Sequence, residues 1–257
     1  MEQDLSMPLA EVLPHIQDGI LRNTSYFGVK TLKSPMDAWV YQEILFEYRP
    51  DVIVEIGNAC GGSALYLAHL CDILGNGRII GLDLGHDNVP ASVKEHPRIT
   101  FIDGDACQNF ARVEAMILPS ERVLVIEDSS HTFENTLNVL RLYSKFTALG
   151  DYFIVEDSIC HHGLRVGPDP GPYEAIEAFV LENRDFEIDR SREHFFLTWN
   201  PKGYLKRTAL NHPHSTVPPL GQAAANDGKN KPQTREGYKP FVPSVLIRLL
   251  RTIFQRR

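Results

Sequence analysis

Short apolar runs alternate with longer amphipathic segments through most of the chain. The apolar runs, which are rich in Val, Ile and Phe, are 51–56, 78–83, 99–103, 122–128 and 151–157. Continuous apolar runs of this length are typical of parallel strands that are covered on both faces. The segments with the length and spacing of helices are 36–48, 61–74, 106–118 and 133–149. This alternation predicts a series of βαβ units with right-handed crossovers.

Two more strand-like runs, 185–189 and 193–199, close the series with few residues between them. The short connection predicts an antiparallel hairpin at one end of the sheet. The predicted fold is therefore α/β and Rossmann-like: a mostly parallel seven-stranded sheet with a C-terminal antiparallel hairpin and helices on both faces. Residues 1–50 would form an N-terminal helical extension, and residues 51–205 the main domain.

The composition changes after about residue 206. Residues 206–242 are rich in His, Pro, Gly, Asn and Lys without periodicity, which predicts a flexible linker. Residues 243–257 are again largely apolar, with four arginines and no acid, which predicts a short basic amphipathic helix. Such a helix can make peripheral contact with an anionic membrane, but packing on its own domain or on a second subunit is favoured.

The overall composition is that of a soluble globular protein. Hydrophobic residues make up 43% and charged residues 23% of 257 residues, and the formal net charge is −7. Residues 206–257 hold 10 basic and 2 acidic side chains, so this average conceals an acidic main domain and a basic tail. We expect no nucleic-acid partner. The lack of a signal or spanning segment and the four scattered cysteines predict a cytoplasmic protein.

The first strand ends in the glycine-rich loop EIGNACGGS, residues 55–63. Gly57 and Gly61 allow the backbone to turn sharply and a ligand to approach it closely. The loop does not have the G-x-G-x-x-G spacing of dinucleotide-binding proteins, because Asn58 and Ala59 follow the first glycine. An NAD-dependent dehydrogenase is therefore disfavoured, and a tight turn without a ligand is the plainer alternative.

Acidic residues stand at the ends of the first three strands, at Glu55, Asp83 and Asp105. Ligands of open α/β sheets bind at this carboxyl edge. Asp83 is placed to bind ribose hydroxyls and Asp105 lies near the position of an adenine. Glu55 would repel phosphate but can accept a hydrogen bond from an ammonium group. The pattern favours a nucleoside cofactor with an amino-acid group and no phosphate, a description that S-adenosylmethionine matches.

A second acidic cluster falls at the same edge. The fourth strand ends in Glu127 and Asp128, and the fifth in Glu156 and Asp157. Converging carboxylates repel one another unless a cation separates them, and oxygen ligands favour Mg²⁺, or Mn²⁺ or Ca²⁺. Alternation along the strand places Glu156 and Asp157 on opposite faces, which counts against one shared ion. Solvated acids that cap the following helices are the other interpretation.

His131 follows Asp128 by three residues, at the start of the next predicted helix. Its ordinary pKa, about 6.5, suits a general base at neutral pH, and its place beside the acidic cluster and the glycine loop makes it the candidate. The pairs His161-His162 and His212–His214 are interpreted as loop residues, although the first pair can also line a substrate pocket.

At these residues the chain resembles the cephalosporin hydroxylase / rhamnosyl O-methyltransferase family, whose members have the class I S-adenosylmethionine methyltransferase fold. The resemblance covers about residues 20–205. It lies in the segments YFGVKTLKSPMDAWVYQEILFEYRPDVIVEIG, GGSALYLA, FIDGDA, EDSSHTFENTLNVLRLYS, GDYFIVEDS and FFLTWNPKGYLKR. Metal-dependent sugar O-methyltransferases of macrolide biosynthesis are similar in the D-x-x-H and E-D elements.

The resemblance implies that Asp128, Glu156 and Asp157 bind Mg²⁺ and that His131 is the general base. The resemblance also implies that the cofactor contacts Glu55, Gly57, Ser63, Asp83, Asp105 and Gln42. We add Gly61, because it belongs to the same glycine-rich loop. The resemblance also implies a homo-oligomer.

We therefore expect an O-methyltransferase that uses S-adenosylmethionine and Mg²⁺ to methylate a hydroxyl of a sugar, such as a rhamnosyl glycoside or glycolipid. The metal would lower the pKa of the acceptor hydroxyl, and His131 would remove its proton. A catechol is the second choice of acceptor. The rival function is a protein of the same fold that serves a hydroxylation complex without methylating anything itself.

Overall fold

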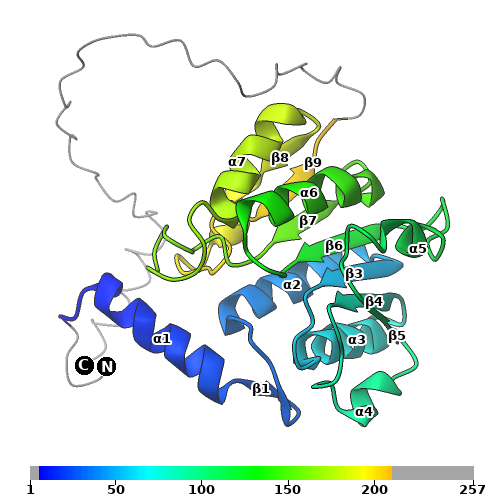
Figure 1. Cartoon of the computed structure of the whole chain (residues 1–257), viewed down its shortest axis with the longest axis horizontal. Coiled ribbons are helices and arrows are strands. Elements are labelled where there is room, and N and C mark those ends of the chain that lie inside the picture. The colour runs from blue at the N-terminus through cyan, green and yellow to red at the C-terminus, as the bar shows by residue number, and fades with distance from the viewer. Residues whose placement is uncertain (1–5, 210–257) are drawn as a thin grey trace, which may run out of the picture. The chain divides into compact units, whose positions relative to one another are not determined.

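The structure is a computed structural model, and it describes residues 6–209. Its centre is a seven-stranded sheet with the strand order β5-β4-β3-β6-β7-β9-β8 (Figure 1). The strands are β3 (Val52–Ile56), β4 (Arg78–Asp83), β5 (Ile99–Asp103), β6 (Val123–Glu127), β7 (Tyr152–Val155), β8 (Phe186–Ile188) and β9 (Tyr204–Arg207). The first five run parallel, and β9 is antiparallel to both of its neighbours. The predicted fold class is confirmed.

Helices pack on both faces of the sheet (Figure 1). The helices are α1 (Leu9–Asn23), α2 (Pro35–Tyr48), α3 (Gly62–Leu74), α4 (Ala91–Lys94), α5 (Phe110–Glu114), α6 (Phe133–Tyr143) and α7 (Pro172–Glu182). One core cluster joins α5, α6 and α7 to one face, and a second joins α2, α3 and α4 to the other. The central strands are therefore buried on both sides, which explains their continuous apolar sequence.

The N-terminal region contains α1, a two-stranded hairpin of β1 (Ser25–Tyr26) and β2 (Val29–Lys30), and α2. Helix α2 begins where the hydroxyl of Ser34 accepts a hydrogen bond from the backbone N–H of Asp37, with Pro35 in the first turn. This agrees with the helix predicted at 36–48. Helix α1 lies outside both helical layers (Figure 1), where Leu13 and Ile20 pack in a small cluster with Trp199.

The prediction of the second strand of the hairpin, at residues 193–199, is wrong. Residues 193–199 form no strand; the hairpin pairs β8 with β9, and a 3₁₀ turn, Arg190–Glu193, lies between them. Two of the aromatic residues that suggested a strand, Phe195 and Phe196, are 40% and 96% exposed. Tyr204 and Leu205 are fully buried and pair with β7 instead. Strand β9 ends at Arg207.

Helix α7 was not predicted, and α5 is shorter than the segment 106–118 suggested. The predicted linker beyond residue 209 and the basic helix at 243–257 lie outside the described residues. Within residues 6–209, no helix is long and apolar enough to cross a membrane.

Asp37 joins α2 to the last part of the sheet. Its carboxylate is 4% exposed and accepts hydrogen bonds from the Thr198 hydroxyl at 2.5 Å, the Trp199 backbone N–H at 2.9 Å and the Tyr204 hydroxyl at 2.9 Å. Buried donors that lose their acceptor cost free energy, because water cannot replace it. These bonds hold Thr198 and Trp199 against α2 rather than in a strand, and they tie α2 to the start of β9 at Tyr204.

We expect Asp37→Ala to lower the free energy of unfolding by about 3 kcal/mol, because it leaves two buried donors and the half-buried Thr198 hydroxyl without their acceptor. Urea denaturation measures the change. The control is Asp18→Ala, which removes an exposed ion pair to Arg22 and should cost less than about 0.5 kcal/mol. Equal losses in the two variants would contradict this account of Asp37.

Candidate functional site

The loop after β3 requires glycine at two of the predicted positions. Gly57 has φ +92, and a Cβ there would lie 2.0 Å from the carbonyl oxygen of Asp128 at the end of β6. Gly61 has φ +79 at the start of α3, where a Cβ would lie 2.8 Å from Val89. Both positions combine a left-handed backbone with a close approach that excludes side chains. The glycine loop therefore lies directly against the second acidic cluster.

A cavity of about 520 Å³ opens at the carboxyl ends of the parallel strands. The predicted site residues that line it are Gly57, Asp83, Asp105, Asp128, His131, Glu156 and Asp157. Gln17, Ile20 and Leu21 of α1 form part of its wall. Members of both acidic clusters predicted from the sequence thus face one cavity.

Backbone N–H groups hold Asp83 in place. One oxygen, Oδ2, accepts from the N–H groups of Asn58 and Ala59 at 2.8 Å each, and Oδ1 accepts from Leu84 at 2.7 Å. Asp105 accepts from the N–H of Gln108 at 2.9 Å. Both carboxylates are therefore fixed before any ligand arrives, and a carboxylate oxygen can still accept a further hydrogen bond from a ribose or an adenine.

Asn58 occupies the place where the loop departs from the dinucleotide fingerprint. It is 2% exposed. Its side-chain amide donates to Glu55 Oε2 at 2.6 Å, and its carbonyl oxygen faces His86 Nε2 at 3.0 Å. His86 in turn lies 2.5 Å from Asp103. Asn58 and His86 thus connect the ends of three strands, and nothing in their spacing along the sequence signalled it.

Four predicted cofactor residues do not line the main cavity: Gln42, Glu55, Gly61 and Ser63. Glu55 is fully buried and, with Ser63, lines a second cavity of about 320 Å³ between α2 and α3. Gln42 lies on α2, but Asp37 of that helix faces the main cavity instead. Their roles in cofactor binding stay predictions.

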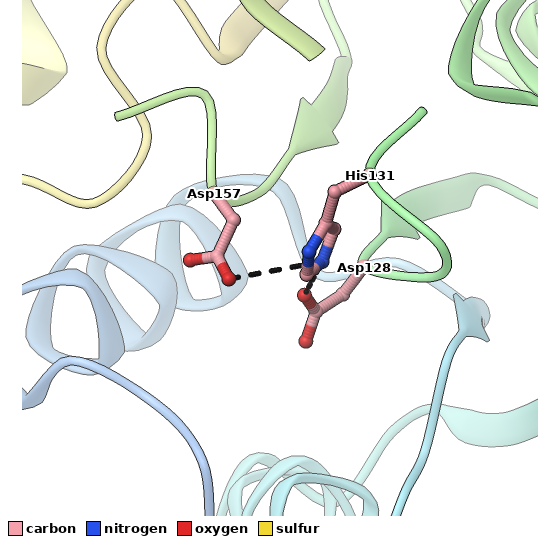
Figure 2. A group of neighbouring side chains, drawn as sticks. All are labelled: Asp128, His131 and Asp157. Carbon is pink, nitrogen blue, oxygen red and sulfur yellow. Dashed lines mark hydrogen bonds and ion pairs between the residues drawn. The ribbon is translucent and has the colours of Figure 1, made fainter. Parts of the chain in front are cut away.

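Asp128, His131 and Asp157 form a compact group in which one atom of each lies within 4.8 Å of the others. Figure 2 shows His131 between the two carboxylates. Its Nε2 atom is 3.1 Å from Asp128 Oδ1 and 3.7 Å from Asp157 Oδ2. His131 and Asp157 both have left-handed backbones, with φ of +57 and +53. This conformation is strained for residues other than glycine and is concentrated at functional sites.

Lys33, which the sequence analysis did not single out, belongs to the same cluster. Its Nζ atom lies 2.5 Å from Asp128 Oδ2 and 2.5 Å from Glu156 Oε1. Its side chain is only 9% exposed. Lys33 stands far from both acids in the sequence, so only the folded structure brings the three together.

The electrostatic balance of the cluster shifts several pKa values. Burial alone would lower the pKa of His131, but its hydrogen bond to Asp128 and the charges of Asp128 and Asp157 outweigh burial and raise it to about 9. Burial, then the charge of Asp128, raises the pKa of Asp157 to about 6. Burial raises the pKa of Glu127 to about 7. Burial is the largest cause of both raised carboxyl pKa values, and the charge of Asp128 adds to it.

The donor set fits a hard divalent cation. Two carboxylates and an imidazole are within reach of one point, and a third carboxylate, Glu156, lies beside them, bound to Lys33. The carboxylate oxygens suit Mg²⁺ or Mn²⁺. An ion there would offset the mutual repulsion of these carboxylates.

The comparison with known proteins identifies the family. A family model of Rhamnosyl O-methyltransferase/CmcI proteins matches residues 18–208. The chain belongs to this family. Curated Rhamnosyl O-methyltransferases are similar to it: that of Mycobacterium tuberculosis (strain ATCC 25618 / H37Rv) is 34% identical over 191 residues, covering 72% of this chain and 78% of the relative. That of Mycobacterium leprae (strain TN) is 33% identical over 195 residues, covering 73% and 85%.

Solved structures of CmcI are similar to this member of the Rhamnosyl O-methyltransferase/CmcI family. One, named as a complex with Mg and S-adenosylmethionine, is 30% identical with a TM-score of 0.55, and covers 72% of this chain and 77% of CmcI. One with S-adenosylhomocysteine has a TM-score of 0.52 at 25% identity, with 72% and 81% covered. At the level of the family, the predicted O-methyltransferase is confirmed.

Without added metal ions, His131 should stabilise the fold in a pH-dependent way. Its folded pKa of about 9 exceeds the unfolded value of about 6.5. The stabilisation is therefore complete below about pH 6.5 and is lost as the pH rises through about 9. We expect wild type to exceed His131→Gln by roughly 2 kcal/mol at about pH 6 and to match it above about pH 10 in urea denaturation. A difference that does not change with pH would contradict the interaction.

Proposed function

We propose that this chain binds S-adenosylmethionine and Mg²⁺, with Mn²⁺ or Ca²⁺ as alternative ions, and transfers the methyl group to a hydroxyl of a sugar. The observation that carries the proposal is one cavity in which Asp83 and Asp105 face the group formed by Asp128, His131 and Asp157. Such a cavity can hold a nucleoside cofactor and an activated hydroxyl side by side. The cofactors named in the CmcI structures support the same pair of ligands.

The cofactor would lie over the glycine loop. Asp83, fixed by the loop's own N–H groups, would accept from the ribose hydroxyls, and Asp105 lies on the adenine side. The absence of a Cβ at Gly57 lets the loop lie directly against the backbone of Asp128, so that the cofactor site and the acidic cluster adjoin. Holding donor and acceptor in one cavity supplies the orientation that a transfer reaction needs.

His131 is the proposed base. Its Nε2 atom faces Asp128 Oδ1, so Nδ1 is the ring nitrogen that would receive the proton of the acceptor hydroxyl. Asp128 Oδ1 holds the imidazole ring at 3.1 Å and stabilises the imidazolium once the proton has moved. The metal, held by Asp128, Glu156 and Asp157, would lower the pKa of the hydroxyl. Its charge beside Asp128 and Asp157 would also bring the pKa of His131 down from about 9 toward the working pH.

An apolar chamber beside His131 and Asp157 supports an acceptor with an apolar part. This cavity, of about 260 Å³, is walled mainly by apolar residues: Leu21, Ile159, Cys160, Leu164, Val166 and Trp199. A sugar hydroxyl at His131 would place the rest of the glycoside, or its apolar aglycone, in the chamber. The sugar itself is proposed from the names of the curated relatives.

Removal of the proposed base or of its carboxylate partner should abolish methylation. We expect His131→Ala and Asp128→Asn to lower kcat/KM by more than about 100-fold with labelled S-adenosylmethionine and rhamnosyl glycosides. Chelation of divalent ions should have a similar effect. The matched control is His162→Ala, because His162 also pairs with a carboxylate, Glu174, at 2.5 Å. Near wild-type turnover in His131→Ala would exclude the proposed base.

The same assay separates the rival functions. Product formed by the isolated chain favours the enzyme over a non-methylating role in a hydroxylation complex, and a catechol acceptor tests the second choice of substrate. A homo-oligomer, a cytoplasmic location and peripheral membrane contact through residues 243–257 stay predictions.

Helix α1 should affect the acceptor more than the cofactor. Leu21 lines both the main cavity and the apolar chamber. We expect Leu21→Ala to raise KM for the glycoside by about 5-fold, because apolar contact is lost, and to leave the affinity for S-adenosylhomocysteine unchanged in calorimetry. Leu9→Ala, on the exposed start of the same helix, is the control. If Leu21→Ala changed the affinity for S-adenosylhomocysteine and left KM for the glycoside unchanged, the proposed acceptor site beside α1 would be contradicted.

A further inference from the structure

The ammonium of Lys33 lies inside the acidic cluster that the proposed function assigns to a metal ion. Its Nζ atom is 2.5 Å from one oxygen of Asp128 and 2.5 Å from one oxygen of Glu156. A third acid, Glu55, has Oε1 3.9 Å away. The exposed fractions of the Lys33, Glu55 and Glu156 side chains are 9%, 0% and 6%. Water therefore screens these charges poorly, and one lysine faces three carboxylates.

The two oxygens of Asp128 have different partners. Oδ2 faces Lys33, whereas Oδ1 faces His131 at 3.1 Å and the group that includes Asp157. Lys33 thus lies on the inner side of the carboxylates, and the outer side remains turned to the cavity. An ion bound at the outer side would share Asp128 with the ammonium.

The charges in the cluster depend strongly on one another. Burial alone would lower the pKa of Lys33, but the charges of Asp128, Glu156 and Glu55 raise it, so the ammonium form is retained. Removal of one partner of a buried ion pair lowers the stability of the folded protein by several kcal/mol, because the other charge is left buried without a counter-charge. A divalent ion that shares a carboxylate with the ammonium is repelled by it.

We propose that Lys33 is the resident counter-cation of this acidic cluster, and that a divalent metal ion binds against its charge. The inference rests on the proposed function only in assigning Asp128, Glu156 and Asp157 to a metal ion. Lys33 is a positioning residue: it holds Asp128 and Glu156 in place when no metal is bound, and it keeps the intrinsic metal affinity low.

Lys33→Met tests the proposal, because it keeps most of the unbranched side chain and removes its charge. In chelator, we expect the Tm to fall by about 10 °C, since buried carboxylates lose their cation. Saturating Mg²⁺ should raise the Tm of the variant by about twice the shift seen in wild type. Calorimetry with Mg²⁺ alone should give a Kd about tenfold lower in the variant.

Three controls separate charge from packing. Lys145→Met removes a half-exposed lysine paired with Glu114 and should change neither the Tm nor the Mg²⁺ affinity. Lys33→Arg keeps the charge and should bind Mg²⁺ within about twofold of wild type. The double variant Lys33→Met/Glu156→Gln removes one charge of each sign. In chelator, its Tm should recover most of the fall seen in Lys33→Met. This variant keeps the test decisive if Lys33→Met alone does not fold.

The outcomes distinguish this inference from the proposed function. Equal Mg²⁺ shifts in wild type and Lys33→Met, or weaker Mg²⁺ binding in the variant, would overturn the role of Lys33 while leaving the metal site in place. An unchanged Tm of Lys33→Met in chelator would do the same. If Mg²⁺ binds neither protein, the metal in the proposed function is contradicted, and the inference falls with it.

Discussion

Burial of acidic side chains at the carboxyl edge of the sheet is the constraint on which the rest of the site depends. Glu55, Glu127 and Glu156 are each 5% exposed or less, and a buried carboxylate is costly unless other groups replace its water. Their partners differ: the Asn58 amide binds Glu55, the Ser129 hydroxyl binds Glu127, and the Lys33 ammonium binds Glu156. Each acid thus requires a particular neighbour, and these neighbours come from separate parts of the chain.

The N-terminal region belongs to this site and is more than an extension of the domain. The segment between β2 and α2 carries Lys33 to the cluster, and Gly62 makes its approach possible. A Cβ at Gly62 would lie 2.0 Å from the Thr31 hydroxyl and 2.4 Å from the Lys30 carbonyl oxygen. The two adjacent glycines of the loop, Gly61 and Gly62, are therefore required for different reasons. Gly61 supplies a left-handed turn, whereas Gly62 leaves room for the segment that brings the counter-charge.

The sequence predicted the parts of the site that follow from strand period and topology. Glu55, Asp83, Asp128 and Asp157 lie at strand ends, and parallel strands bring such ends to one edge whatever the side-chain details. The hairpin partner was misplaced because the apolar run at 193–199 looks like a strand, yet Asp37 holds Thr198 and Trp199 against α2.

Partners that meet only in the folded chain could not be predicted in this way. Lys33 precedes Asp128 by 95 residues, and His86 reaches Asn58 across 28. No local period or motif joins such positions. These partners matter because the acids are buried. The burial becomes evident only when the neighbouring helices and loops are in place.

The positions of Glu156 and Asp157 resolve a conflict that the alternation rule raised. In an extended strand, neighbouring side chains point to opposite faces, and Glu156 indeed faces Lys33. Asp157 departs from the extended conformation at φ +53, so its carboxylate comes to 3.7 Å from His131. The adjacent acids therefore reach the same cluster from different sides, because the backbone leaves the strand between them.

That departure is held in place by the fold. The N–H of Asp157 donates to Asn200 Oδ1 at 3.1 Å, and Asn200 donates to the Tyr41 hydroxyl of α2 at 3.0 Å. A left-handed backbone costs about 1–2 kcal/mol per non-glycine residue, and His131 bears the same cost. If either residue relaxed to an extended backbone, the carboxylate and the imidazole would separate. The geometry of the site is therefore set by the backbone and its buried partners before any ligand binds.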